Sequence, residues 1–292
     1  MRQDDETQTR LYKEYWQPIE VMFGSRYGTD FDKFIRDYLT LQLRLSTQIR
    51  SEDTYPQFRS YYFGANANTK LPKILDDLKR FAGYYVAFNH GQEEESKLRE
   101  GLRRLRVLLD VAAPVVMTLY ECHKRHKTLT LPHFTEAVEV LESYVFRRSV
   151  CDMQTRSLGQ IFALLASRID TKDPFQSLKI ALARQGESRR FPTNAEFKAA
   201  LETRDIYHMR NRHYFLDRLE NDSKEKINTS KFTVEHVLPQ NAKLRPEWQK
   251  MLGSNWKETQ REWLNRLGNV TLTGYNSEYS DRPFSDKKSI LV

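Results

Sequence analysis

The segment KFTVEHVLPQN, residues 231–241, places an acid and an imidazole side by side near the end of an apolar, β-prone run. These two residues are Glu235 and His236, and Pro239 then ends the predicted strand. An imidazole with a pKa of about 6.5 can accept a proton from water at neutral pH, and carboxylates are preferred ligands of Mg²⁺. The pair is therefore suited to phosphodiester hydrolysis, in which a base activates water and a hard cation neutralises developing charge.

Two asparagines flank a second β-prone run further along the chain, in LGNVTLTGYNSEYSDRPFSDKK, residues 267–288. Asn276 follows this run and can supply an amide oxygen to the cation, Mg²⁺ or Mn²⁺, beside the carboxylate of Glu235. Asn269 precedes the run and is better placed to fix the loop by hydrogen bonds to the backbone than to touch the ion. We therefore predict His236 and Asn269 as catalytic-site residues, with Glu235 and Asn276 as metal ligands.

Three basic residues near the predicted last helix, Arg282, Lys287 and Lys288, are expected to hold a phosphate backbone. Two short strands, a connecting loop and a helix are the layout of a ββα-metal, or His-Asn-His, nuclease site. The alternative is a buried histidine satisfied by a neighbouring glutamate, with two asparagines in turns. Each residue taken singly favours that alternative, but their combination favours the nuclease interpretation.

The upstream sequence must form the scaffold for this segment, and it is typical of amphipathic helices. Asp30 is expected to cap the first of them, and Pro114 to kink the third. The predicted helical stripes cover 31–45, 74–86, 98–116 and 134–145, and further helices begin at a Thr193–Glu196 capping box and over 207–219.

The amino-acid composition changes at the polar run NDSKEKINTS, residues 221–230. After this run, short β-prone segments alternate with tryptophan-rich helical segments. We predict a mainly α fold, in which a multi-helical region over residues 1–203 precedes a small α+β domain of the ββα-metal, HNH-like type over residues 204–292.

Composition agrees with this organisation. The 292 residues are 39% hydrophobic and 29% charged, and only 11 are glycine and 10 proline, which suits long helices better than a many-turned β-sandwich. A formal net charge of +8 permits a polyanionic partner such as nucleic acid. Two cysteines, no secretory signal and no membrane span predict a cytoplasmic protein without a disulfide framework.

Other standard sites are absent from the sequence or weakly indicated. No Gly-x-x-x-x-Gly-Lys-Ser/Thr or Gly-x-Gly-x-x-Gly motif occurs, so no nucleotide site is expected. Cys122, His123 and His126 could in principle hold a metal. Cations gathered in the last turn of a helix explain the same run better, because they complement the helix dipole.

The motifs VEHVLPQN (234–241) and LGNVTLTGYNSEYSDRPFSDKK resemble the C-terminal, His-Asn-His-type part of GmrSD-like modification-dependent restriction endonucleases. Four upstream segments resemble the helical middle region of the same proteins, namely residues 9–24, 32–43, 144–162 and 207–220. The resemblance implies a prokaryotic restriction and antiviral defence factor that cleaves foreign, modified DNA. It also implies His236 as general base, Glu235 and Asn276 as metal ligands and Asn269 as the loop-fixing asparagine.

The sequence departs from this family in two places. No Asp-Gly-Gln-Gln-Arg motif is present, so the family's N-terminal nucleotide-hydrolysing domain is expected to be a missing partner domain or subunit. The chain also stops at SILV, so we expect a truncated final helix. The competing hypothesis is a non-catalytic helical module that binds DNA or a partner protein and carries a degenerate nuclease tail. A nuclease that cuts RNA is a further alternative.

Overall fold

The computed structural model describes residues 5–65 and 71–290, and its internal contacts divide the chain into two compact units. The helical unit comprises Met1–Arg148 and Gln154–Phe191, and the C-terminal unit comprises Ser149–Met153 and Pro192–Val292. The expected boundary lay after residue 203, whereas this division falls twelve residues earlier, between 191 and 192 (203 − 191 = 12). The helix that starts at the predicted capping box therefore belongs to the C-terminal unit.

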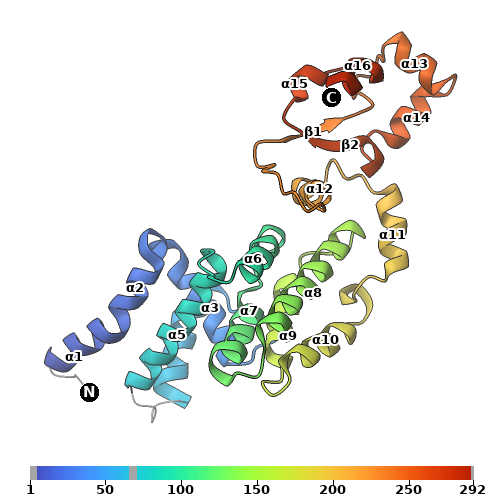
Figure 1. Ribbon diagram of the computed structural model, residues 1–292. Coiled ribbons are helices and arrows are strands. Elements are labelled where there is room, and N and C mark those ends of the chain that lie inside the picture. The colour runs from blue at the N-terminus through green and yellow to red at the C-terminus, as the bar shows by residue number, and fades with distance from the viewer. Residues whose placement is uncertain (1–4, 66–70, 291–292) are drawn as a thin grey trace. The chain divides into compact units, whose positions relative to one another are not determined.

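The helical unit consists of helices joined by short turns (Figure 1), which confirms the predicted mainly α fold. Its α-helices are α1 (Asp5–Leu11), α2 (Gln17–Phe23), α3 (Tyr27–Gln42), α4 (Thr54–Ser60), α5 (Leu71–Asn89), α6 (Ser96–Leu108), α7 (Ala113–Tyr120), α8 (Leu131–Val150), α9 (Leu158–Arg168) and α10 (Pro174–Ala183).

Two of the predicted helix boundaries are wrong. Helix α3 begins at Tyr27, so Asp30 is not its cap but lies in its first turn, where it pairs with Lys33 at 2.9 Å. The stripe expected as one kinked helix forms two helices, α6 and α7. Pro114 lies at the start of α7, where its missing N–H costs no hydrogen bond and its fixed φ suits a first turn.

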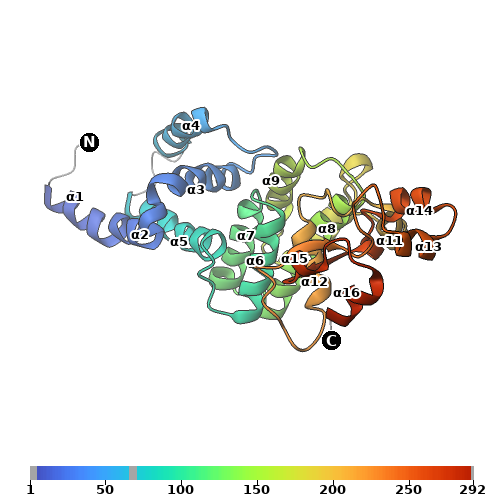
Figure 2. The same ribbon diagram turned by 90° about the horizontal axis from the view of Figure 1, so that it is seen from above.

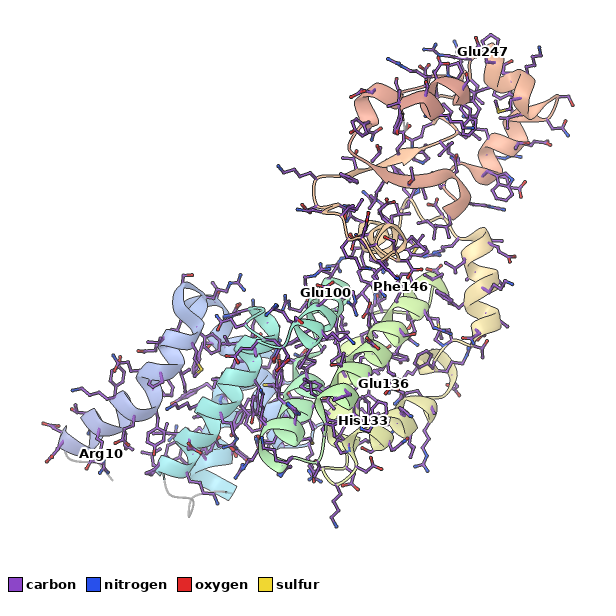
Figure 3. The ribbon with its side chains drawn as sticks, viewed as in Figure 1. Arg10, Glu100, His133, Glu136, Phe146 and Glu247 are labelled. Atoms are coloured by element: carbon purple, nitrogen blue, oxygen red, sulfur yellow. The ribbon has the colours of Figure 1, made fainter. Side chains whose placement is uncertain are left out.

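The core of the helical unit lies around α5, which packs against α2 and α7. Phe23, Phe34 and Tyr85 meet there with ring centroids 5.5–5.8 Å apart, and all three side chains are buried. Figure 2 shows α4 beside α3, a contact that extends this helical layer. The solvent face of α6 is charged, and Glu100, labelled in Figure 3, pairs with Arg103 at 2.7 Å.

The Cys122–His126 run forms a wide helical turn, Glu121–His126, after α7. His123 Nδ1 lies 2.8 Å from the carbonyl oxygen of Leu129, and Cys122 is buried. In the part of the chain that the structure describes, no group of three or more His, Cys, Asp or Glu side chains could hold a metal ion.

The C-terminal unit combines short helices with one two-stranded antiparallel sheet. Its elements are α11 (Asn194–Thr203), α12 (Arg212–Glu220), β1 (Thr233–His236), α13 (Pro246–Leu252), α14 (Trp256–Trp263), β2 (Val270–Thr273), α15 (Asn276–Tyr279) and α16 (Phe284–Ile290). The capping box predicted at Thr193 and Glu196 is present at the start of α11, with both reciprocal hydrogen bonds formed. Both β-prone pieces form strands, as predicted.

The sheet is covered by helices that follow or precede it in the chain. Helix α12 contacts β2 and α15 contacts β1, and Figure 1 shows the two strands between these helices. A small apolar cluster of Leu238, Leu244 and Trp248 lies under α13, whereas Glu247 of the same helix is exposed, as Figure 3 shows. Across residues 5–65 and 71–290, no helix combines the length and apolar character needed to cross a bilayer.

Candidate active site

Strand β1 gives Glu235 and His236 different surroundings, although they are neighbours in sequence. Successive side chains of a strand point to opposite faces. Glu235 faces α16, where it contacts Lys287, and His236 faces the turn before α12, where it contacts Tyr207. Within the described residues, no hydrogen bond joins His236 to Glu235 or to Asn276. The expected convergence of imidazole, carboxylate and amide on one point is not seen in this arrangement.

Glu235 takes part in a buried ion pair that the sequence analysis did not anticipate. Lys287 Nζ donates hydrogen bonds to Glu235 Oε1 at 2.7 Å and to the carbonyl oxygen of His236 at 2.9 Å. Only 6% of the Lys287 side chain and 10% of the Glu235 side chain are exposed. A buried ammonium needs such partners, because desolvating an unpaired charge costs several kcal/mol.

This ion pair corrects one of the three predicted phosphate contacts. Lys287 lies on the inward side of α16, so its ammonium is directed at β1 rather than at a ligand outside the unit. Lys288 and Arg282 are exposed, as a phosphate-binding role requires. The backbone of Arg282 is held by Trp248, whose indole Nε1 donates to the Arg282 carbonyl at 3.0 Å.

The imidazole of His236 is buried, with 5% of the residue exposed. Its Nε2 lies 3.2 Å from Asn265 Oδ1, and its ring centroid lies 4.4 Å from that of Tyr207. Burial lowers the pKa of His236 below the ordinary 6.5. The Lys287 ammonium acts in the same direction, whereas the hydrogen bond to Asn265 and the charges of Glu235 and Asp205 oppose the shift. The ring is therefore neutral at pH 7 and can act as a base.

Asn269 fixes the loop that follows β1, through three hydrogen bonds to backbone. Its Oδ1 accepts from the Leu238 N–H at 2.6 Å, and its Nδ2 donates to the carbonyl oxygens of Leu238 at 3.1 Å and Leu264 at 2.8 Å. Asn269 is buried and ends the short turn Leu267–Asn269 that leads into β2. These are the contacts expected of a loop-fixing asparagine.

Asn276 begins α15 and lies against the start of β1. Its Nδ2 donates to Thr233 Oγ1 at 3.0 Å and to the carbonyl oxygen of Val234 at 3.3 Å. The amide oxygen of Asn276 and the second carboxylate oxygen of Glu235 have no hydrogen bond within the described residues. Thr233 and Glu235 share a face of the strand, so both free oxygens belong to the side covered by α15 and α16.

The chemistry of these donors fits a hard divalent cation. Mg²⁺ binds through one or two protein oxygens and completes its octahedral shell with waters and substrate phosphates. Lys287 Nζ already contacts Glu235 Oε1 and the His236 carbonyl, so the second carboxylate oxygen of Glu235 and the amide oxygen of Asn276 are the atoms left to hold such an ion. A site with a single carboxylate is consistent with the lack, among the described residues, of any cluster of three acidic, histidine or cysteine ligands.

Three residues around His236 were not predicted from the sequence. Asp205, Tyr207 and Asn265 surround the ring or its hydrogen-bond partner, but none belongs to a motif with a recognised spacing. One local signal was present. Asp205 accepts a hydrogen bond from the backbone N–H of His208 at 3.0 Å. Asp favours a local turn of this kind, because its side chain can bond to backbone groups a few residues further on.

The C-terminal unit is thus a small α+β domain whose two-stranded sheet presents an acid–histidine pair at the end of its first strand, with one asparagine before the second strand and another after it. Residues 191–291 match the family model described as GmrSD restriction endonucleases, C-terminal domain. The resemblance to these enzymes is therefore confirmed for this part of the chain, and it indicates a role related to restriction endonucleases. A search of curated proteins found no match to the chain.

Proposed function

We propose that this protein is a metal-dependent DNA endonuclease that acts in prokaryotic restriction and antiviral defence, with His236 activating the attacking water. The observation that carries the proposal is the set of polar residues around β1, inside the region that matches the restriction-endonuclease model. Action in the reducing cytoplasm is part of this proposal, and Cys122 and Cys151 form no disulfide with each other.

The proposed chemical step is an in-line attack of water on a backbone phosphorus. His236 Nδ1 takes the proton of the water as its oxygen forms the new bond to phosphorus. One P–O bond of the DNA backbone breaks, and the leaving oxygen takes a proton from solvent. A neutral imidazole is required at the start, and the burial that lowers the pKa of His236 favours that neutral form at pH 7.

The oxygens of Glu235 and Asn276 are proposed to hold the cation, Mg²⁺ or Mn²⁺. When bound, such an ion neutralises charge on the phosphate oxygens as the phosphorus is attacked. Arg282 and Lys288 are proposed to position the DNA backbone, because both are exposed basic residues beside or on α16. The helical unit would orient the DNA or receive a signal from a nucleotide-hydrolysing partner domain or subunit.

A nicking assay on supercoiled plasmid, with Mg²⁺, with Mn²⁺ and with EDTA, tests this proposal. We expect nicked or linear DNA in the presence of either cation and none with EDTA. Base-modified plasmid and an RNA competitor in the same assay identify the preferred substrate. Intact plasmid under all conditions, with and without base modification, would contradict the proposed activity of this chain.

A second function is favoured by two observations. Lys287 already neutralises Glu235, and His236 is buried, so this arrangement is also what a non-catalytic DNA-binding module would show. Such a module predicts retarded DNA without nicks on a gel, and affinity that falls steeply with salt because counterions are released. The plasmid assay therefore separates the two functions directly.

The pH dependence of cleavage gives a further test. Because burial lowers the pKa of His236 below 6.5, the base is still unprotonated at pH values where an exposed histidine is half charged. We expect kcat/KM to rise with pH and to reach half of its maximum below pH 6.5. A half-maximal point well above 6.5 would argue against His236 as the group whose deprotonation limits cleavage.

A further inference from the structure

Three side chains in the C-terminal unit form a hydrogen-bonded series that ends on His236. Asn265 Nδ2 donates to Asp205 Oδ2 at 3.0 Å, and Asn265 Oδ1 lies 3.2 Å from His236 Nε2. Nothing in the predicted nuclease motif includes Asp205 or Asn265. The series approaches the imidazole from the face of β1 opposite to Glu235.

The chemistry of the series defines which imidazole nitrogen carries the hydrogen. A carboxylate only accepts hydrogen bonds, so the group that Asn265 directs at Asp205 must be its NH₂. The amide oxygen of Asn265 therefore faces His236, and an oxygen can pair only with an N–H. His236 consequently carries its hydrogen on Nε2, which leaves the Nδ1 lone pair as the only basic position of the neutral ring.

The backbone holds this series in place. The carbonyl oxygen of Asn265 accepts from the N–H groups of Ile206 at 2.8 Å and Tyr207 at 3.3 Å. Asp205 in turn accepts from the backbone N–H of His208 at 3.0 Å and lies 2.8 Å from its Nδ1. The turn before α12 and the end of α14 are thus tied together at the place where His236 is held.

The Tyr207 ring restricts the imidazole from a second direction. The Tyr207 centroid is 4.4 Å from that of His236, with an interplanar angle of 59°, and the Arg212 guanidinium lies 5.4 Å from the centroid of the Tyr207 ring. Rotation of His236 out of its hydrogen bond would meet this ring. The Asn265 amide fixes which ring nitrogen of His236 carries the hydrogen, and the Tyr207 ring restricts the orientation of the imidazole.

A metal site is the competing interpretation, because Asp205, His208 and His236 all approach Asn265. In the described part of the chain, however, no three His, Cys, Asp or Glu side chains are grouped so that they could share one ion. The hydrogen bonds of Asn265 also point its amide hydrogens at Asp205, which is the wrong polarity for a ligand of a cation placed between them.

We propose that Asn265 is a positioning residue, supported by Asp205, which holds His236 in the Nε2–H tautomer so that Nδ1 is the atom that accepts the proton of water. The catalytic part of this inference rests on the proposed endonuclease function. The tautomer itself can be measured without any cleavage.

The experiment uses the full chain with ¹⁵N-labelled histidine and reads the ring nitrogens by long-range ¹H–¹⁵N NMR at pH 7.5. For His236, identified by its loss in H236A, we expect a protonated Nε2 and an unprotonated Nδ1. Asn265→Ala should change the tautomer ratio by roughly fivefold to tenfold, the worth of one neutral hydrogen bond. Asn221→Ala, the same change at an asparagine elsewhere in the unit, should leave the ratio unchanged.

Asp205→Leu gives a second route if Asn265→Ala does not fold. Without the carboxylate the amide of Asn265 is free to turn over and offer its NH₂ to the ring, so Nδ1–H should increase. The exchange Asn265→Asp with Asp205→Asn keeps an acceptor oxygen toward Nε2 and a donor between the two side chains, so it should keep the wild-type tautomer. A wild-type ring protonated on Nδ1, or a ratio unmoved in both Asn265→Ala and Asp205→Leu, would overturn the proposal.

Cleavage measurements on the same variants distinguish failure of the tautomer proposal from failure of the proposed nuclease function. If H236A cuts plasmid as well as the wild type does, the nuclease role of His236 is wrong whatever the tautomer. If H236A is inactive, Asn265→Ala should lower kcat roughly 10- to 100-fold with little change in KM, and the exchange of Asn265→Asp with Asp205→Asn should recover part of the loss. An inactive H236A with a fully active Asn265→Ala would remove Asn265 from the mechanism.

Discussion

In the helical unit most of the fully buried side chains are apolar, and Phe34 and Leu39 of α3 are fully buried among such neighbours. In the C-terminal unit, buried apolar side chains such as Ile206 and Phe215 are accompanied by polar ones of similar burial, namely Glu235, His236 and Asn269. A two-stranded sheet cannot supply a large apolar core. Directed hydrogen bonds and a buried ion pair between Lys287 and Glu235 therefore supplement a small apolar core in the C-terminal unit, and the same bonds position its candidate active-site residues.

This difference teaches that the two units should tolerate substitution differently. An apolar core loses stability in proportion to the volume removed, whereas a polar network loses it when one partner leaves another unpaired. In the C-terminal unit a single substitution can therefore change fold and site together.

The largest effect is expected for His236→Ala in cleavage. Removal of a general base lowers kcat by a factor on the order of 10²–10⁴, while DNA binding, which depends on exposed basic residues, should survive. His133→Ala, at an exposed histidine of the helical unit, is the control and should cut normally. Single-turnover cleavage and gel retardation measure both properties. Wild-type cleavage by His236→Ala would remove this residue from catalysis.

The apolar core is tested by Phe34→Ala. Truncating a fully buried phenylalanine should cost about 3–5 kcal/mol of the free energy of unfolding of the helical unit. Phe63→Ala, at a side chain 75% exposed in the same unit, should cost far less. Hydrogen exchange followed by mass spectrometry reads each unit separately. Equal loss of protection in both units would contradict their independence as cores.

The ion pair is tested by Lys287→Met, which leaves the buried carboxylate of Glu235 without a partner. We expect the C-terminal unit to lose about 3–5 kcal/mol, and Glu235→Gln added to Lys287→Met should recover part of it. Lys288→Met at the neighbouring exposed position is the control. Thermal melts with Mn²⁺ add a second readout, because a cation at Glu235 should restore stability to Lys287→Met. No effect of Mn²⁺ on any variant would contradict the ligand assignment.

A smaller loss is expected for Asn269→Ala. The variant leaves the N–H and carbonyl of Leu238 and the carbonyl of Leu264 without their side-chain partner, which should cost about 1–3 kcal/mol. Asn255→Ala, at an exposed asparagine of the same unit, provides the comparison in urea unfolding. A midpoint for Asn269→Ala equal to that of Asn255→Ala would show that the loop is held by something else.

The helical unit also contains a buried carboxylate, that of Asp37, and its replacement should have the smallest effect on stability. Burial raises the pKa of Asp37 from 3.8 to about 6. The folded state therefore binds more protons between these two values, so stability should fall as pH rises from 4 to 6 and stay level above. Asp37→Asn should remove this slope and add on the order of 2 kcal/mol at pH 7.

Asn at position 37 can still accept the hydrogen bond that Gln48 Nε2 donates to Asp37, so the substitution changes charge without removing that contact. Asp32→Asn, at an exposed position of the same helix, is the control. Urea midpoints measured at pH 4, 5, 6 and 7 decide the matter. An unchanged slope in Asp37→Asn would assign the pH dependence to another group.

The helices of both units could be predicted from sequence because apolar periodicity acts locally. The stripes over 74–86 and 134–145 form α5 and α8, and the capping residues at Thr193 and Glu196 form their bonds as expected. Helix starts were less certain. The one at Tyr27 has no side-chain cap, so Asp30 gave a misleading signal three residues late.

The candidate site was predicted only in part. The strand ends follow from nearby sequence, because turn and strand residues act over a few positions, and a loop-fixing role for Asn269 was expected from its place before the second strand. The pairing of Lys287 with Glu235 and the contact of Asn265 with His236 join residues far apart in sequence. No periodicity encodes which buried cation meets which carboxylate, so these pairs required the three-dimensional structure.

The ion pair of β1 has a consequence for how the protein is made. Lys287 lies 52 residues after Glu235, on α16. During synthesis the strand emerges from the ribosome with its carboxylate uncompensated, and the matching ammonium arrives only when that later helix has been translated. Assembly of this side of the strand is thus a late event in the life of the nascent chain, after the helices of the first unit have had time to fold.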